Sequence, residues 1–375
     1  MNILAFNWQD IRNPLGGGAE VHFHEIFKRI AARGHRVTLC CSSFPGARPT
    51  EEIDGIRVIR KGGRNLFNFQ VPFRYLAGLR KDIDVVVDDL NKIPFFTPWF
   101  VGKPLVTIVH HLFGKSIFTE ASFPAALYVA ASERLAMKVY RKTLTAVVSK
   151  STAQELESFG FSRSRLVQVP NCVDHALYVP PPAVQTQIVI GYLGRLKKYK
   201  CIEDLLYALN IVAKEFPEVR LHIIGDGDAR EELERIAGEL EIADKVKFFG
   251  YVPQKDKVRY LQELQLVVNT SSKEGWGLTV IEANACGVPV VASDVPGLRD
   301  SVVDGKTGFL YDFGNVEQLA QKVLSVIRDS DLRQKLSQGA IEWSQTFQWD
   351  KSADKMLEVL ERAVREKGKA ASAGA

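Results

Sequence analysis

The chain of 375 residues is long for one domain, so two domains are expected. Hydrophobic residues make up 46% and charged residues 25%, a globular composition that excludes a wholly disordered or fibrous protein. The net charge of +5 is uneven: residues 1–180 carry 23 basic and 15 acidic side chains (+8) and the remainder 26 and 29 (−3), which indicates either different partners for the two halves or an ordinary solvated surface.

Neither a membrane span nor a signal peptide is predicted. No apolar run approaches the roughly 18 residues that cross a bilayer, and Met1–Trp8 lacks a basic region and a small-residue cleavage site. The five cysteines are odd in number and lack ligand-like spacing, which argues against a disulfide framework and a structural zinc site. A reducing, cytoplasmic compartment is therefore expected.

The first half opens with a strand, a glycine loop, a helix and a second strand. Asn2–Asn7 is a short apolar strand, followed by the loop Gly16–Gly18. An amphipathic helix is predicted over Ala19–Arg33, and Gly34 stands where a helix commonly ends. Arg36–Cys41 is typical of the next buried strand.

The second half repeats this order. It has a strand at Ile188–Leu193, a Gly194-Arg195 turn, a helix near Ile202–Phe216 and a strand at Arg220–Ile224. Strands alternating with helices predict βαβ units, so each half is expected to be an α/β, doubly wound, Rossmann-like domain. Pro180–Pro182 can neither continue a helix nor donate to a sheet, which favours a linker there.

Two glutamates mark the strongest candidate site. Glu274 and Glu282 are separated by seven residues, with Gly275 and Gly277 after the first and a helix predicted over Leu278–Cys286. Along a helix that spacing is about 12 Å, comparable to the span of a nucleotide sugar from hexose to ribose. The N–H groups at the helix start can receive a diphosphate, and carboxylates bind paired hydroxyls strongly. An ordinary exposed helix with two glutamates is the alternative.

This E-x7-E segment resembles the donor-binding motif of glycosyltransferase family 4, retaining enzymes of the GT-B fold. Further segments resemble that family in the same order along nearly the whole chain. They are Gly16–Glu20, Val109-His110, Gly194–Leu196 with Lys200, Ile224–Gly227, Gly250–Val252, Val295–Leu298 and Asp304–Leu310. Two places depart from the family pattern: Cys201 follows Lys200 where the family usually has glycine, and His111 follows His110, which leaves the choice of histidine open.

The resemblance implies a role for each matched residue. Glu274 would hold the hydroxyls of the transferred sugar and Glu282 the ribose diol. Arg195 and Lys200 would neutralise the diphosphate, and His110 would contact and align the sugar. The implied catalytic residues are His110, Arg195, Lys200 and Glu274. The implied donor-binding residues are Gly16, Gly17, Gly18, Arg195, Lys200, Gly225, Tyr251, Val252, Glu274, Gly275, Trp276, Gly277, Leu278 and Glu282.

A structural role is the alternative for each of these. Arg195 and Lys200 could be solvated charges at a turn, His110 a strand-end histidine with its hydrogen bonds satisfied, and Gly16–Gly18 a plain hinge. The positions favour a site, because ligands of open α/β sheets bind beyond the carboxyl ends of the strands. Three glycines before a helix also allow close approach of an anion.

No metal and no cofactor is expected. The pairs Asp82/Asp84 and Asp226/Asp228 resemble metal-binding carboxylates, but the first precedes a buried strand and the second lies in a turn, so both are interpreted as structural. Two segments that end like a phosphate-binding loop lack its first glycine. They are Gly114–Ser116 and Gly305–Thr307.

The resemblance implies two domains facing a cleft. Residues 1–180 would form the acceptor-side domain, residues 181–350 the nucleotide-sugar domain, and residues 351–375 a C-terminal helix that packs back on the first domain, with a flexible tail. The expected reaction moves a sugar from a UDP- or GDP-sugar to an acceptor hydroxyl with retention, in envelope polysaccharide or glycolipid synthesis. A nucleotide-sugar epimerase and an inactive sugar-nucleotide binding module are the alternatives.

The acceptor is expected to be a glycan or a lipid-linked saccharide. Residues 60–80 and 92–123 of the basic half mix cations with aromatic rings, which suits anionic lipid at the inner face of the membrane. The alternative is that most rings belong to the core. Nucleic acid is not expected, because no binding motif is present. The residues concerned are Arg60, Lys61, Arg64, Phe67, Phe69, Phe73, Arg74, Phe95, Phe96, Trp99, Phe100, Phe113, Lys115 and Phe118.

Overall fold

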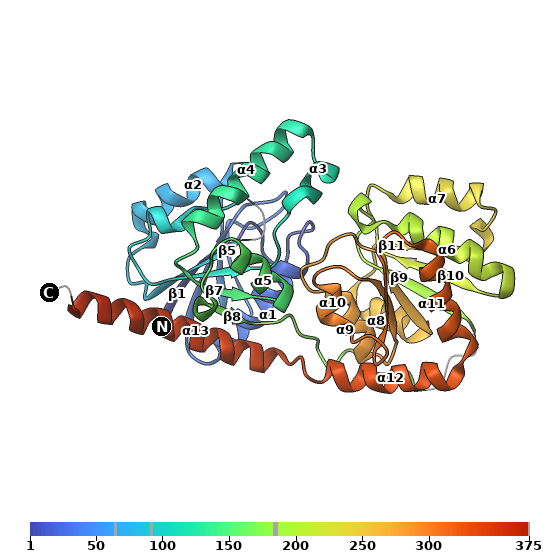
Figure 1. Ribbon diagram of the computed structural model, residues 1–375. Coiled ribbons are helices and arrows are strands. Elements are labelled where there is room, and N and C mark those ends of the chain that lie inside the picture. The colour runs from blue at the N-terminus through green and yellow to red at the C-terminus, as the bar shows by residue number, and fades with distance from the viewer. Residues whose placement is uncertain (64–65, 91–92, 183–186, 374–375) are drawn as a thin grey trace. The chain divides into compact units, whose positions relative to one another are not determined.

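A computed structural model describes residues 1–63, 66–90, 93–182 and 187–373 (Figure 1). The chain divides into two compact units, Met1–Asn171 with Trp349–Ala375, and Cys172–Gln348. The division falls ahead of the proline run at Pro180–Pro182, and the last helix belongs to the first unit. Each unit is a parallel-sheet α/β domain, which confirms the predicted fold class.

The first unit is built on an eight-stranded sheet of order β3-β4-β2-β1-β5-β6-β7-β8, parallel except for the antiparallel pair β3 and β4. Its central strands β1, β5 and β6 are mostly apolar and almost completely buried, as helices on both sides of a parallel sheet require, although β5 ends with Asp88 and Asp89 before Leu90. The strands are β1 (Asn2–Phe6), β2 (Arg36–Cys41), β3 (Thr50–Ile53), β4 (Ile56–Arg60), β5 (Val85–Leu90), β6 (Leu105–Val109), β7 (Leu144–Val147) and β8 (Leu166–Gln168).

Helices lie on both sides of this sheet (Figure 1). The main helices are α1 (Gly18–Ala32), α2 (Phe67–Arg74), α3 (Ile117–Glu120), α4 (Phe123–Val139), α5 (Lys150–Ser158) and α13 (Trp349–Ala373). Shorter turns are η1 (Tyr75–Leu79), η2 (Thr97–Trp99), η3 (Gly114–Ser116) and η4 (Arg163–Arg165). Helix α13 packs along α1 and against β5, β6 and β7, so the two ends of the chain complete one core.

The second unit has a six-stranded, all-parallel sheet of order β11-β10-β9-β12-β13-β14. Its strands are β9 (Val189–Leu193), β10 (Arg220–Ile224), β11 (Val246–Gly250), β12 (Leu266–Asn269), β13 (Val290–Ser293) and β14 (Gly308–Tyr311). Its helices are α6 (Ile202–Glu215), α7 (Arg230–Glu239), α8 (Gln254–Glu263), α9 (Leu278–Ala285), α10 (Leu298–Ser301), α11 (Val316–Arg328) and α12 (Ser330–Ser344), with the turns η5 (Lys198–Lys200) and η6 (Ala243–Lys245). The amphipathic helices α6 and α11 pack together over this sheet.

The expectation that Arg60 contributes a surface cation is wrong. Its guanidinium is fully buried: Nε and Nη2 donate to Asp10 at 2.6 and 2.7 Å, and Nη1 donates to Glu51. Two carboxylates therefore compensate one buried cation, as a charge removed from water requires.

Two of the predicted acceptor-side rings are also buried. Phe67 and Phe95 pack on each other and on Trp8, with ring centroids 5.6–5.9 Å apart, because they fill the space beside β1 and β5. Arg64 and Lys92 lie outside the described residues, as does the side chain of Lys115. Within the described chain, no helix combines the length and apolarity needed to cross a membrane.

Candidate functional site

The predicted donor residues of the second unit gather where its sheet changes direction. Strand β9 lies between β10 and β12, so the chain winds outward from β9 to one side and later to the other. Such a switch point leaves a crevice at the carboxyl ends of the strands, where α/β sheets bind ligands. The loops that follow β9, β10 and β12 carry Arg195, Gly225 and Glu274.

An ion pair joins two of these loops. The Nζ ammonium of Lys200 donates to the Glu274 carboxylate, which also accepts from Ser271 Oγ at 2.9 Å. The side chains of Lys200 and Glu274 are 13% and 17% exposed. Burial disfavours the ammonium, but Glu274, with the tyrosines nearby, outweighs it and the pKa of Lys200 is raised. A localised positive charge therefore stands beside the carboxylate predicted to hold the sugar.

The backbone of the same loops is held in register by hydrogen bonds. Thr270 Oγ1 donates to the Lys200 carbonyl at 2.8 Å, and the N–H and hydroxyl of Ser272 both donate to the Tyr199 carbonyl at 2.9 Å. Arg195 is exposed, and its carbonyl accepts from the Tyr192 hydroxyl at 3.2 Å, so its backbone is fixed while its guanidinium faces solvent. The turn after β9 thus presents one exposed cation, Arg195, and one cation held in an ion pair, Lys200.

Two glycines allow these loops to approach each other. Gly225 has φ +140, and a Cβ on it would lie 1.9 Å from the Gly194 carbonyl oxygen. Gly297 has φ +85, and its Cβ would lie 2.3 Å from the carbonyl oxygen of Glu274. Any side chain at either position would push the neighbouring loop away, so both glycines set the position of predicted site residues.

Glu282 lies inside helix α9 and is only 5% exposed. Its carboxylate accepts from the Tyr178 hydroxyl at 2.8 Å, and the Lys257 ammonium stands 2.7 and 2.6 Å from its two oxygens. Tyr178 and Lys257 were not predicted from the sequence, because no local spacing relates them to Glu282. Together they hold a buried carboxylate whose charge is compensated by Lys257.

The other predicted donor residues of this unit differ in exposure. Gly277 is the N-cap of α9 at φ +88, and Leu278 is the first residue of that helix. The Trp276 ring is buried and packs edge-to-face on Phe347, with the ring centroids 5.0 Å apart, so the ring is not exposed at the surface of the loop. Tyr251 is 84% exposed after β11. Two further predicted residues, Gly275 and Val252, are half-buried.

In the first unit, the predicted histidine is part of a buried polar chain. His110 follows β6 and hydrogen-bonds through Nε2 to Asp89 at 2.8 Å, and Asn7 donates to the same carboxylate at 2.9 Å. A carboxylate accepts only, so Nε2 carries the proton and Nδ1 is the acceptor. The His22 ring packs edge-on against His110 at 5.1 Å and bonds the Val169 carbonyl. Asp89 and His22 were not anticipated from the sequence.

Burial keeps both histidines neutral near pH 7. Desolvation lowers the pKa of His110 to about 4, although Glu20 acts in the opposite direction. Desolvation and the neighbouring His110 lower the pKa of His22 to about 3. His110 is therefore suited to accept or donate a hydrogen bond but not to carry charge. His111 is half-buried, with its ring against Phe113 at 5.2 Å.

The predicted glycine loop Gly16, Gly17 and Gly18 leads directly into α1. Gly18 is the first residue of the helix, and the Gly17 N–H donates to Glu20 Oε2 at 2.7 Å. A carboxylate thus already occupies part of the helix N-terminus where an anion was predicted to bind. The glycines still allow a ligand to approach the backbone of the loop closely. A phosphate bound at this helix N-terminus would, however, lie beside the Glu20 carboxylate.

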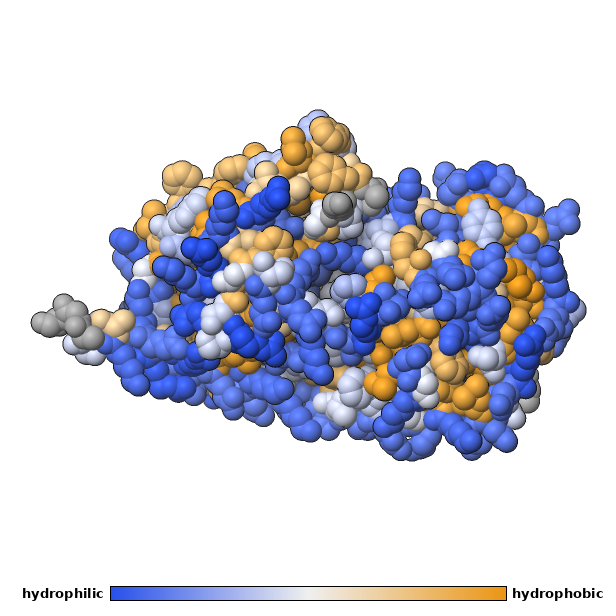
Figure 2. Space-filling view, in the orientation of Figure 1, coloured by the Kyte–Doolittle hydropathy of each residue, from blue (hydrophilic) through white to orange (hydrophobic). Residues whose placement is uncertain are grey.

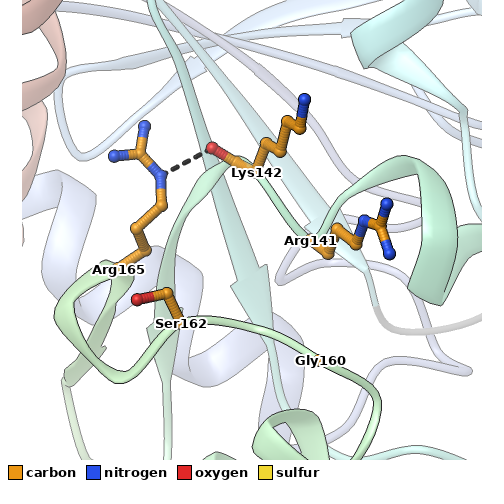
Figure 3. A pocket seen from close by; sticks show the side chains of 5 residues that line it. All are labelled: Arg141, Lys142, Gly160, Ser162 and Arg165. Atoms are coloured by element: carbon orange, nitrogen blue, oxygen red, sulfur yellow. Dashed lines mark hydrogen bonds between the residues drawn. The ribbon is translucent and has the colours of Figure 1, made fainter.

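A separate hollow in the first unit contains none of the predicted residues. Arg141, Lys142, Gly160, Ser162 and Arg165 line it (Figure 3). The three basic side chains extend in different directions, and Arg165 Nε donates a hydrogen bond to the Lys142 carbonyl at 2.6 Å. The three side chains therefore do not converge on one anion. Among the described residues, no three His, Cys, Asp or Glu side chains gather as metal ligands.

Known proteins match the chain over nearly its whole length. The model of Glycosyltransferase Family 4 matches residues 16–177, and that of Glycosyl transferases group 1 matches residues 179–343. A D-inositol 3-phosphate glycosyltransferase of Thermomonospora curvata is 31% identical, over 92% of this chain and 90% of its own length.

Two solved structures share the fold. The sucrose-phosphate synthase of Thermosynechococcus elongatus superposes with a TM-score of 0.82 at 20% identity, over 96% of this chain and 98% of its own. The Anabaena protein HepE, solved with UDP and glucose, has a TM-score of 0.78 at 21% identity, over 96% of this chain and all of its own. From its sequence matches, the chain belongs to the group 1 glycosyltransferases of family 4, and its two α/β domains are those of the GT-B fold.

Proposed function

We propose that this glycosyltransferase moves a sugar from a UDP- or GDP-sugar to an acceptor hydroxyl with retention of anomeric configuration. The observation that carries the proposal is the Lys200–Glu274 pair at the switch point of the second sheet, beside the exposed Arg195. It combines cations for a diphosphate with a carboxylate for sugar hydroxyls. The solved HepE complex contains UDP and glucose, which supports a nucleotide-sugar donor.

The difficult step is departure of the nucleoside diphosphate from the anomeric carbon. Negative charge grows on the leaving phosphate as the glycosidic bond lengthens, and fixed cations lower the energy of that state more than of the ground state. Lys200 supplies charge in a place fixed by Glu274, and Arg195 reaches the diphosphate from solvent. Both act without a proton transfer of their own.

Glu274 and Glu282 orient the donor along its length. Glu274 accepts from hydroxyls of the transferred sugar, and Glu282 accepts from the ribose diol while Tyr178 and Lys257 hold its carboxylate. In the retaining route, the acceptor oxygen attacks from the face that the diphosphate leaves, and the leaving phosphate oxygen takes the acceptor proton. The role of His110 at the sugar stays a prediction.

Replacing the cations and the ribose carboxylate separates their roles. Arg195→Ala and Lys200→Met are expected to lower kcat strongly, whereas Glu282→Ala raises the donor KM, at about 1.5–3 kcal/mol of binding free energy. Arg220→Ala is the matched control, because Arg220 is exposed at the opposite end of the same sheet. Equal small changes in both constants for all three variants would refute the assignment.

The donor and the acceptor need separate experiments. A thermal-shift panel of UDP-, GDP- and ADP-sugars identifies the base, since a ligand at about 100 times its Kd adds about 2.7 kcal/mol of stability. We propose a glycan or lipid-linked saccharide as acceptor. Product analysis with and without acceptor distinguishes a transferase from an epimerase, which converts donor alone, and from an inactive binding module, which converts nothing.

We also propose that transfer needs no divalent metal, because the two cations supply the positive charge a metal would otherwise provide. Activity in EDTA is expected to equal activity in magnesium or manganese. Complete loss in EDTA with recovery in manganese would show instead that carboxylates such as Asp226 and Asp228 bind a metal.

A further inference from the structure

The first unit exposes an apolar surface that the proposed reaction does not use. Of the sixteen large hydrophobic side chains exposed in the described chain, ten lie between residues 66 and 135. Figure 2 shows apolar side chains gathered over the upper part of the first unit, where Figure 1 places α2, α3 and α4. We call this surface the α2–α4 face. Its most prominent side chains are Phe69, Phe73, Leu76, Trp99, Phe123 and Leu127.

Contacts join the helices of this face into one surface. Asn68 of α2 donates to the hydroxyl of Tyr128 on α4 at 3.4 Å, and the rings of Phe118 and Phe123 join α3 to α4 at 5.9 Å. Helix α2 runs directly into η1. The face is therefore continuous, and a continuous exposed apolar patch commonly marks an interaction site.

Helix α4 shows how little of this face the fold itself covers. Only Ala126, Ala136 and Met137 of its 17 residues are buried, whereas Phe123 is 70% and Leu127 53% exposed. These exposed side chains contribute little to the stability of the fold, because an apolar side chain stabilises the folded state mainly when it is buried.

The charge of the α2–α4 face is positive. Helix α3 carries one exposed acidic residue, Glu120. Residues 61–81, which include α2 and η1, contain five Lys and Arg and no acidic residue. Among these, Lys61, Arg80 and Lys81 are exposed. On α4 the single acidic residue, Glu133, accepts from the backbone N–H groups of Phe113 and Gly114, while Arg134 is exposed.

We propose that the α2–α4 face docks on a bilayer that contains anionic lipid. Aromatic and leucine side chains enter the boundary between headgroups and acyl chains, and the surrounding cations meet the phosphates. A second copy of the chain fits less well, because a two-fold interface would bring the same basic surface against itself. The proposal is independent of the reaction, since docking needs neither donor nor acceptor.

Vesicle flotation of the full chain tests the docking. Vesicles of phosphatidylcholine with one third phosphatidylglycerol are expected to carry the protein at low salt, and pure phosphatidylcholine to carry much less. Phe73→Ser with Phe123→Ser should lower the partition coefficient at least about tenfold. Arg80→Glu with Lys81→Glu should lower it at least about thirtyfold, since each of the two cations near an anionic surface contributes about fivefold.

Matched variants outside the face control for hydrophobicity and charge. Phe313→Ser removes an exposed ring of the second unit, and Lys367→Glu with Lys369→Glu reverses two exposed charges on α13. These are expected to float like the unchanged chain. Absence of binding at low salt, or equal losses in face and control variants, would overturn the proposal. A dimer in sedimentation that Phe73→Ser with Phe123→Ser dissociates would assign the face to a second copy instead.

Discussion

The coupling between Lys200 and Glu274 is predicted to be large for an ion pair near a surface. At an effective dielectric constant of about 20, two unit charges about 4 Å apart attract by about 4 kcal/mol. Residual exposure of 13% and 17% screens part of this, so we expect a coupling free energy of about 2 kcal/mol. An exposed pair typically contributes about 0.2–1 kcal/mol.

A double-mutant cycle measures this coupling. Lys200→Met keeps the aliphatic stem, and Glu274→Gln keeps an acceptor for Ser271, so each change removes charge with little change of shape. In urea unfolding, the stability losses of the two single variants should add up to more than the loss of the double variant. Each single change leaves one partly buried charge uncompensated, whereas the double change removes both charges. The pair Lys197 and Asp228, at 34% and 68% exposure, is the control cycle. A Lys200–Glu274 coupling no larger than the control would refute the reasoning.

Three further outcomes follow from the described contacts. The pKa values of His22 and His110, about 3 and 4, lie below the unfolded value, so the unfolded chain binds more protons as the pH falls from about 6.5 towards 4. Stability in urea should therefore fall by about 2 kcal/mol per histidine between pH 7 and 5, and His110→Gln should reduce that slope. Gly297→Ala should lower kcat/KM for the donor by displacing Glu274 while the far-ultraviolet circular dichroism stays unchanged. Arg60→Met should cost about 3–5 kcal/mol in unfolding free energy, since two carboxylates lose their buried cation, and a loss below about 1 kcal/mol would contradict the buried ion triad.

Local patterns predicted the fold well because each depends on neighbouring residues. The strand Arg36–Cys41 and the helix Ala19–Arg33 follow from apolar runs and glycine positions. The structure has the strand at the same residues and the helix one residue earlier, at Gly18–Ala32. The loop position of Glu274 and the helical position of Glu282 follow likewise from the glycines between them. Such signals act over a few residues, so a single sequence contains them.

The partners of buried charged side chains could not be predicted in this way, because they lie far apart in the sequence. Arg60 looks like any surface cation until Asp10, from 50 positions earlier, is seen beside it. The same holds for Tyr178 and Lys257, which meet Glu282 from 104 and 25 positions away. Burial of a charge depends on partners that only the folded chain brings together.

Helix α13 lies at the C-terminal end of the described chain but packs in the first unit, so the first unit cannot be completed until α13 has been synthesised. The first unit begins at the N-terminus, yet Ala353, Met356 and Leu360 of its last helix are fully buried in it, and Trp349 lies 6.3 Å from the His22 ring. On the ribosome, residues 1–171 therefore emerge long before the helix that covers α1. The nascent chain must keep this apolar groove from aggregating while the whole second unit is translated, a task that suits a chaperone. The first unit can therefore close only after α13 has been synthesised, and not when its sheet first emerges.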